Sequence, residues 1–123
     1  MKKILIIEDV EMNRDLLVQL LEEEYELVEA VDGRQGLERA AQERPDLILL
    51  DISLPEMDGW EVARRIRADA GLRDVPVIAV TAHAMAGDEE KAYACGCTDY
   101  LTKPIDENDL WKKVRKHLSG DPA

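Results

Sequence analysis

The sequence predicts an α/β fold, a doubly wound parallel sheet with helices on both faces. Three short apolar runs lack any alternation with polar residues, which is typical of strands buried on both sides of a parallel sheet. These runs are Ile4–Ile7, Leu47–Leu50 and Val77–Val80. Two weaker strand candidates are Glu26–Val31 and Asp99–Leu101. Helical patterns separate the five strands, and right-handed crossovers then place helices on both faces of the sheet.

Apolar faces mark the first and the last predicted helix. In the last helix, Asp106 is the N-cap, and acidic residues precede basic ones, as the helix dipole favours. Leu110, Val114 and Leu118 share one face of that helix. We expect the apolar stripe of the first helix to be mostly core; it consists of Met12, Leu16 and Leu20, with Leu17 and Leu21 beside them.

Capping signals delimit the remaining helices. Asp32 and Asp58 both have capping-box spacing ahead of helix-forming sequence. The helix after Asp32 should end at Arg44, because a proline follows. A further helix should run from about Met85 to Cys95 and be closed by Gly96.

Length and composition describe one acidic domain. The chain has 123 residues, and we expect residues 1–119 to form the domain and 120–123 a disordered tail. The formal net charge of −11 argues against direct binding of nucleic acid or of an anionic membrane. No apolar run approaches the roughly 18 residues of a membrane span. Cys95 and Cys97 are too few for a disulfide scaffold, so we expect a cytoplasmic location.

Polar side chains stand where the predicted strands end. Glu8 and Asp9 follow the first strand, Asp51 the third and Thr81 the fourth, and the fifth leads to Lys103. The carboxyl ends of parallel strands meet at one edge of the sheet, where ligands bind. We therefore expect three carboxylates, one hydroxyl and one ammonium group to share that edge.

These groups indicate phosphoryl chemistry. Two carboxylates about 4 Å apart repel by roughly 4 kcal/mol at an effective dielectric near 20, so either one acid is protonated or a cation lies among them. A cluster of oxygen ligands favours Mg²⁺, and the absence of Cys and His from it argues against zinc. A carboxylate beside a divalent cation, a lysine and a threonine is suited to accept a phosphoryl group and form an acyl phosphate.

Five segments carry a resemblance to a known family. Together, in this order and at this spacing, they make the whole chain resemble the receiver domain of two-component response regulators. The segments are Ile6–Asp9, Pro45–Asp51, Leu54–Gly59, Val80–Ala82 and Tyr100–Pro104.

The resemblance implies a role for each residue of the site. Asp51 would accept a phosphoryl group from a phosphohistidine of a sensor histidine kinase or a histidine phosphotransferase. Asp9 would bind Mg²⁺ directly, Glu8 would act through water, and the backbone carbonyl of Ser53 would complete the protein's share of the metal shell. Lys103 would pair with a phosphoryl oxygen.

The resemblance also implies how the signal leaves the site. Thr81 would bond another phosphoryl oxygen in the active state, and Tyr100 would turn inward as the switch aromatic. Phosphorylation would thereby change the affinity of the last two helices and the fifth strand for a downstream protein target. A cis peptide bond would precede Pro104, and the sheet would have the flavodoxin-like order 2-1-3-4-5. Apart from phosphotransfer to itself and slow autodephosphorylation, no enzymatic activity is expected.

The sequence argues against two other functions and leaves a third open. A hydrolase of the haloacid-dehalogenase type would have a second aspartate where Ser53 stands. A flavodoxin-like electron carrier would have a phosphate-binding loop where the acidic segment Glu8–Glu11 stands. The alternative that stays open is a phosphorylation-independent docking module of the same fold. Within the family, His83–Asp88 most resembles receivers of hybrid kinases and of stand-alone cell-division regulators.

Overall fold

The computed structural model describes residues 1–82 and 87–118. Over these residues, five strands alternate with five helices, as the sequence predicts. The elements in chain order are β1 (Lys3–Ile7), α1 (Glu11–Leu21), β2 (Glu26–Ala30), α2 (Gly33–Glu43), β3 (Leu47–Asp51), α3 (Gly59–Ala68), β4 (Val77–Thr81), α4 (Asp88–Ala94), β5 (Asp99–Thr102) and α5 (Glu107–Leu118).

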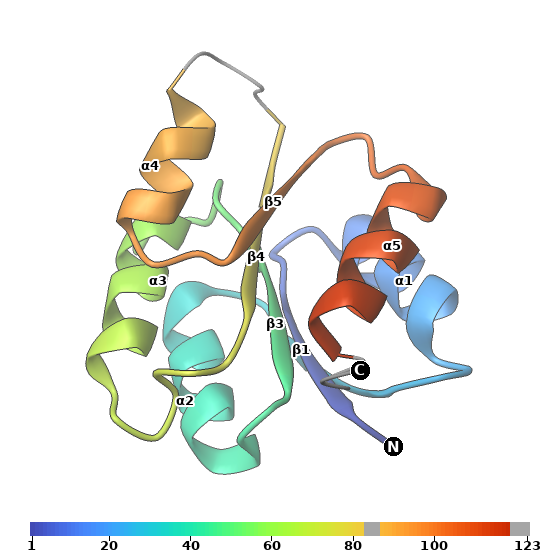
Figure 1. Ribbon diagram of the computed structural model, residues 1–123, viewed down its shortest axis with the longest axis horizontal. Coiled ribbons are helices and arrows are strands. Elements are labelled where there is room, and N and C mark those ends of the chain that lie inside the picture. The colour runs from blue at the N-terminus through green and yellow to red at the C-terminus, as the bar shows by residue number, and fades with distance from the viewer. Residues whose placement is uncertain (83–86, 119–123) are drawn as a thin grey trace.

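The sheet has the predicted order β2-β1-β3-β4-β5, and every pair of neighbouring strands is parallel. Helices α2, α3 and α4 cover one face, and α1 and α5 cover the other (Figure 1). Strand β3 lies in the centre, and its carboxyl end lies between those of β1 and β4. This arrangement confirms the predicted fold class and brings the ends of β1, β3 and β4 together at one edge.

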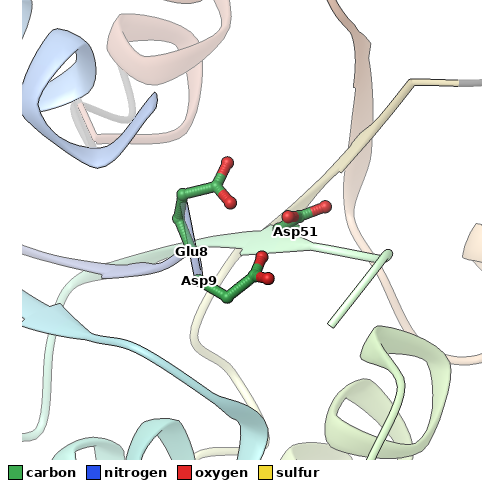
Figure 2. Close-up of side chains that lie close together, drawn as sticks. All are labelled: Glu8, Asp9 and Asp51. Carbon is green, nitrogen blue, oxygen red and sulfur yellow. The ribbon is translucent and has the colours of Figure 1, made fainter. Parts of the chain in front are cut away.

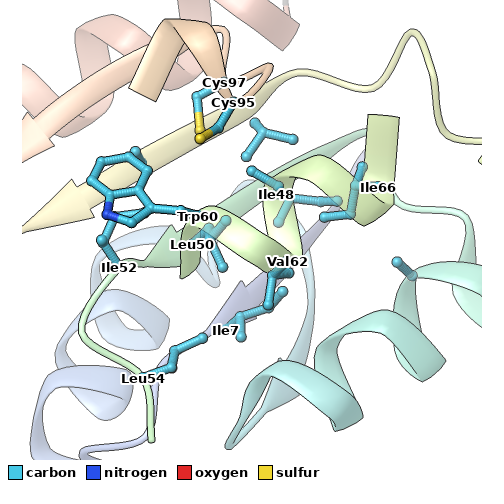
Figure 3. Packing of buried hydrophobic residues seen from close by; sticks show 14 of the residues in the cluster. Ile7, Ile48, Leu50, Ile52, Leu54, Trp60, Val62, Ile66, Cys95 and Cys97 are labelled. Carbon is cyan, nitrogen blue, oxygen red and sulfur yellow. The ribbon is translucent and has the colours of Figure 1, made fainter. Parts of the chain in front are cut away.

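Two aliphatic cores hold the helices to the sheet. On the α2–α3–α4 face, side chains such as Trp60 and Val62 of α3 pack beside Leu50 of β3 (Figure 3). On the α1–α5 face, Leu17 and Leu21 are buried together with the apolar face of α5. Because β1, β3 and β4 contribute to both cores, their apolar runs are buried on both sides.

The predicted caps are present where the structure describes them. The carboxylates of Asp32, Asp58 and Asp106 each accept a hydrogen bond from a backbone amide three residues further on. Helix α2 ends at Glu43, with Arg44 as a left-handed C-cap. Gly96 has a φ of +99°, as a residue that closes a helix requires.

The prediction for the first helix is wrong at two residues. Met12 is 80% exposed and Leu16 is 45% exposed, so neither belongs to the core. Leu17 and Leu21 face the sheet instead, and successive helical residues are rotated by about 100°, which turns Leu16 to the side and Met12 away.

Some predictions fall on residues that the structure does not describe. Helix α4 begins at Asp88, and the predicted start near Met85 lies outside the described residues, as does most of the segment that follows Ala82. The predicted tail, 120–123, lies outside them too. No described helix is long and apolar enough to cross a membrane.

Candidate functional site

Three carboxylates meet where β1 and β3 end. Glu8 and Asp9 directly follow β1, and Asp51 is the last residue of β3. Carboxylate oxygens of the three side chains lie within 4.8 Å of one another. Figure 2 shows the side chains next to each other at the sheet edge. Glu8 and Asp51 are almost fully buried, whereas Asp9 is exposed, so the cluster is open to solvent on the side of Asp9.

A lysine that directly follows the edge strand β5 joins the carboxylates. The Nζ atom of Lys103 lies 2.9 Å from Oε1 of Glu8 and 3.5 Å from Oδ2 of Asp51. The backbone amide of Lys103 donates to the carbonyl of Thr81, which holds the lysine against the end of β4. The Lys103–Pro104 peptide bond is cis, as the sequence analysis expected. One ammonium group therefore faces the two buried acids.

Burial and charge shift the protonation of this cluster. Burial raises the pKa of Glu8, and the neighbouring Asp51 raises it further, against the hydrogen bond from Lys103. Burial lowers the pKa of Lys103, but the hydrogen bond to Glu8 and the charge of Asp51 outweigh burial, so the pKa rises above its ordinary value. The lysine thus stays charged, while part of the negative charge of the cluster is left without a protein partner.

The segment after β3 fixes the orientation of Asp51. The backbone amide of Ser53 donates to Oδ1 of Asp51 at 3.0 Å. Gly59, the first residue of α3, packs directly on the strand end, because a Cβ at this position would lie 2.5 Å from Cα of Ile52 and 2.7 Å from the carbonyl oxygen of Asp51. Only glycine allows this close approach. The sequence motif includes Gly59, and the structure supplies the reason.

The segment after β1 is fixed by contacts that the sequence does not reveal. The backbone amide of Glu8 donates to the carbonyl of Ala30, and Oε2 of Glu8 accepts from the amide of Val10. The guanidinium of Arg14 donates to the backbone carbonyl of Glu8 at 3.0 Å and to the carboxylate of Glu29 at 3.1 Å. The two contacts of Arg14 depend on how α1 sits against the sheet, which no sequence pattern specifies.

The two residues expected to carry the switch lie on neighbouring strands. Thr81, the last residue of β4, is 3% exposed, and its register partner on β5 is Thr102. Tyr100 of β5 is half-buried and packs against the core cluster that includes Ala92 of α4. Thr81 follows Val80, the register partner of Asp51, so one strand separates Asp51 from the strand of Tyr100.

A cavity of about 450 Å³ adjoins the site. It lies between α1 and the segment that follows β5, and Glu8 and Lys103 form its polar part. The remaining lining is Asn13, Leu16, Leu17, Val80, Ala82, Pro104 and Ile105.

The donor set fits a hard divalent cation. All three acids offer oxygen ligands, which Mg²⁺ prefers, and within the described part of the chain neither Cys nor His joins them. Lys103 compensates only part of the charge. The exposure of Asp9 leaves room for water, which Mg²⁺ retains when it binds to proteins.

Comparison with known proteins identifies the class that fold and site define. The family model described as the response regulator receiver domain matches residues 4–115. The chain therefore belongs to the response regulator receiver family, whose members are signalling modules of two-component systems. Receiver domains bind Mg²⁺ in their acidic pocket and interact with histidine kinases and downstream targets.

Individual relatives agree with this assignment. The polar-differentiation response regulator DivK of Brucella anthropi is 44% identical over 121 residues, which are 98% of this chain and 98% of DivK. Among solved structures, the receiver domain of a histidine kinase from Syntrophus aciditrophicus is 34% identical with a TM-score of 0.90, covering 99% of this chain and 93% of that one. A receiver domain of a sensor histidine kinase from Pseudomonas aeruginosa has a magnesium ion coordinated in its active-site cleft; it is 35% identical, with a TM-score of 0.89 and coverage of 97% and 98%.

Proposed function

We propose that Asp51 accepts a phosphoryl group from a phosphohistidine of a sensor histidine kinase or a histidine phosphotransferase. Mg²⁺ would be held by Glu8, Asp9, Asp51 and the backbone carbonyl of Ser53. The observation that carries the proposal is a buried carboxylate at the end of the central strand, with two further acids within 4.8 Å and Lys103 at 3.5 Å.

In the transfer step, a carboxylate oxygen of Asp51 attacks phosphorus in line with the bond to the histidine nitrogen. The new P–O bond forms as the P–N bond breaks, and the electron pair of that bond returns to the imidazole. The ammonium of Lys103 and the hydroxyl of Thr81 stabilise the phosphoryl oxygens by charge and by a hydrogen bond. When bound, Mg²⁺ supplies the positive charge that neutralises the remaining oxygens.

The same site would allow the phosphoryl group to be lost slowly to water. Water would then replace the Asp51 carboxylate at phosphorus, which frees Asp51 and releases inorganic phosphate. Ser53 is exposed beside Asp51, at the position where a dehalogenase-type hydrolase has its second aspartate, and a serine hydroxyl is a poor general base at neutral pH.

The output would be a change in the surface formed by α4, β5 and α5. Thr81 lies one strand position beyond the register partner of Asp51, and its carbonyl accepts from the amide of Lys103, so a shift of Thr81 is transmitted to the end of β5. Tyr100 packs on the same strand against the α4 side of the core. Phosphorylation would favour one of two conformations that already exchange, and a protein target would bind them with different affinities.

The surroundings in which this occurs follow from charge and composition. A formal net charge of −11 disfavours direct binding to nucleic acid or to an anionic membrane. Cys95 and Cys97 are both free thiols, which agrees with a cytoplasmic location. The 44% sequence identity to a polar-differentiation response regulator favours a protein target in the control of cell differentiation.

Intact mass spectrometry tests the proposal. The protein is incubated with acetyl phosphate and MgCl₂ and sampled at short times, beside Asp51→Asn and a metal-free control. Asp46→Asn is the matched variant, because Asp46 precedes the same strand, is exposed and binds the amide of Lys3 at the opposite edge. We expect one added phosphoryl group in the native protein and in Asp46→Asn, and none in Asp51→Asn or without metal. If the native protein gains no group at any time, the phosphorylation-independent docking module becomes the better account.

A further inference from the structure

The segment between β1 and α1 carries two of the three acids, and its second acid, Asp9, lies outside any helix or strand. Val10 is the N-cap of α1, and its side chain makes no capping hydrogen bond. Asp9 is exposed. The Glu8 carboxylate is held by the amide of Val10 and by Lys103, so the direction of Asp9 relative to Glu8 depends on what holds the backbone between the two residues.

Arg14 holds that backbone. Its Nη1 donates to the carbonyl oxygen of Glu8 at 3.0 Å, and its Nε donates to Oε1 of Glu29 at 3.1 Å. The Arg14 side chain is only 14% exposed, although Arg14 lies in the first turn of α1. One planar guanidinium thus connects the segment after β1 with strand β2.

The carbonyl that Arg14 binds belongs to the peptide group joining Glu8 to Asp9. The plane of this peptide determines ψ of Glu8 and φ of Asp9, and thus the angle between the two carboxylates. The amide of Glu8 is already held by the carbonyl of Ala30 on β2. With Arg14 in place, the peptide groups on both sides of the Glu8 Cα have a partner.

We propose that Arg14, held by Glu29, is a positioning residue for divalent cation binding: it sets the Glu8–Asp9 peptide so that the two acids face the cation together with Asp51. This inference rests on the metal site of the proposed function. Two features separate positioning from simple charge. A cation near three acids would by itself weaken Mg²⁺ binding, and the charge of Arg14 is opposed by that of Glu29.

Titration of the full chain with MgCl₂ tests this inference, by isothermal titration calorimetry and by the rise in unfolding temperature. Arg14→Lys keeps the charge but removes the fork that reaches two partners at once. Arg14→Gln removes the charge as well. The matched controls are Arg34→Lys and Arg34→Gln, because Arg34 is 87% exposed and its ion pair with Glu38 is a loose 4.0 Å.

We expect the Mg²⁺ dissociation constant to rise about tenfold in both Arg14 variants, the lower end of what loss of an outer-sphere partner does. Both Arg34 variants should keep the native constant. An unchanged constant in Arg14→Lys, or tighter binding in Arg14→Gln, would show that the residue acts through stability or charge and would overturn the inference. If the native protein itself binds no Mg²⁺, the metal site of the proposed function fails, and the inference fails with it.

Glu29, the partner of Arg14, provides a second test, and its first comparison leaves Arg14 itself unchanged. Glu29→Ala should weaken Mg²⁺ binding more than Glu26→Ala, which removes the same charge from the same strand at an exposed position. In the double variant Arg14→Lys/Glu29→Ala, binding should be no weaker than in Arg14→Lys alone, because both changes break one connection. Equal effects of Glu29→Ala and Glu26→Ala would contradict the proposed connection.

Discussion

The stability of the metal-free domain reports directly on the charge arrangement at the site. Asp51→Asn removes one of three clustered carboxylates and hardly changes the volume of the side chain. The amide oxygen of Asn still accepts the hydrogen bond that the Ser53 amide donates to Oδ1. We expect this variant to be more stable than the native protein when no divalent cation is bound.

The magnitude follows from distances at the site. Two unit charges 4.8 Å apart, the limit of the carboxylate cluster, repel by about 3.5 kcal/mol at an effective dielectric near 20, so Glu8 and Asp9 together repel a charged Asp51 by about 7 kcal/mol. The ammonium group of Lys103, 3.5 Å from Asp51, attracts the Asp51 carboxylate by about 5 kcal/mol at the same dielectric, and this attraction is lost on substitution. The raised pKa of Glu8, caused mainly by burial, and the exposure of Asp9 weaken the repulsion, while burial of the Asp51 carboxylate adds lost hydration. We expect a net gain of about 1–2 kcal/mol on substitution, or roughly 4–10 °C in Tm.

Urea denaturation, followed by tryptophan fluorescence in EDTA and again in MgCl₂, measures this effect. Mg²⁺ at ten times its dissociation constant should add about 1.4 kcal/mol to the native protein and much less to Asp51→Asn. The difference in free energy of unfolding between Asp51→Asn and the native protein should therefore be smaller in MgCl₂ than in EDTA. Asp46→Asn should show no gain in EDTA. A metal-free Asp51→Asn less stable than the native protein, or equal stabilisation of both by Mg²⁺, would refute the reasoning.

Three further predictions concern stability. Gly59→Ala should lower the free energy of unfolding by about 2 kcal/mol, because its Cβ meets the backbone after β3; urea denaturation measures this. Burial raises the pKa of Asp99, but the bonds from His117 and the Tyr100 amide outweigh it and the net pKa is lowered. Asp99→Asn should therefore be less stable near neutral pH, a difference that disappears as the pH falls below the ordinary pKa of 3.8. Native stability should fall as the pH rises from 4.5 through the raised pKa of Glu8, and Glu8→Gln should lack this fall.

Each of these predictions has a control or a contradicting result. Gly71→Ala is the control for Gly59→Ala, because its Cβ meets nothing closer than 3.4 Å, and equal losses in the two variants would contradict the packing argument. A stability difference for Asp99→Asn that persists at low pH would show that the charge of the Asp99 carboxylate is not its source. Parallel pH profiles of native protein and Glu8→Gln would show that Glu8 titrates normally.

The strands and the shared sheet edge were predictable because each rests on a local rule. Apolar runs such as Leu47–Leu50 need both sheet faces covered, and the carboxyl ends of parallel strands have to meet. The sequence alone therefore brought Glu8, Asp9, Asp51 and Lys103 to one place, where the structure puts them. The roles of these residues remain predictions, as does the domain boundary at residue 119.

Contacts between helices and the sheet were not predictable in the same way. The wrong assignment of Met12 and Leu16 to the core arose because a stripe at fourfold spacing does not say which side of the helix faces the sheet. The bond of Arg14 to Glu8 depends on the same unknown rotation of α1. His117 offered no partner in the sequence, yet its Nε2 lies 2.8 Å from the Asp99 carboxylate on β5, a strand that α5 follows.

The most direct test of the central claim is to locate the phosphoryl group. An acyl phosphate is an electrophile, and borohydride reduces it to a primary alcohol, which converts the modified aspartate into homoserine and leaves free carboxylates unchanged. The protein is treated with acetyl phosphate and MgCl₂, reduced, digested and mapped by tandem mass spectrometry. The account predicts homoserine at position 51 and at no other acid. Reduction at Glu8 or Asp9 instead, or no reduced residue in a sample that gained phosphoryl mass, would contradict it.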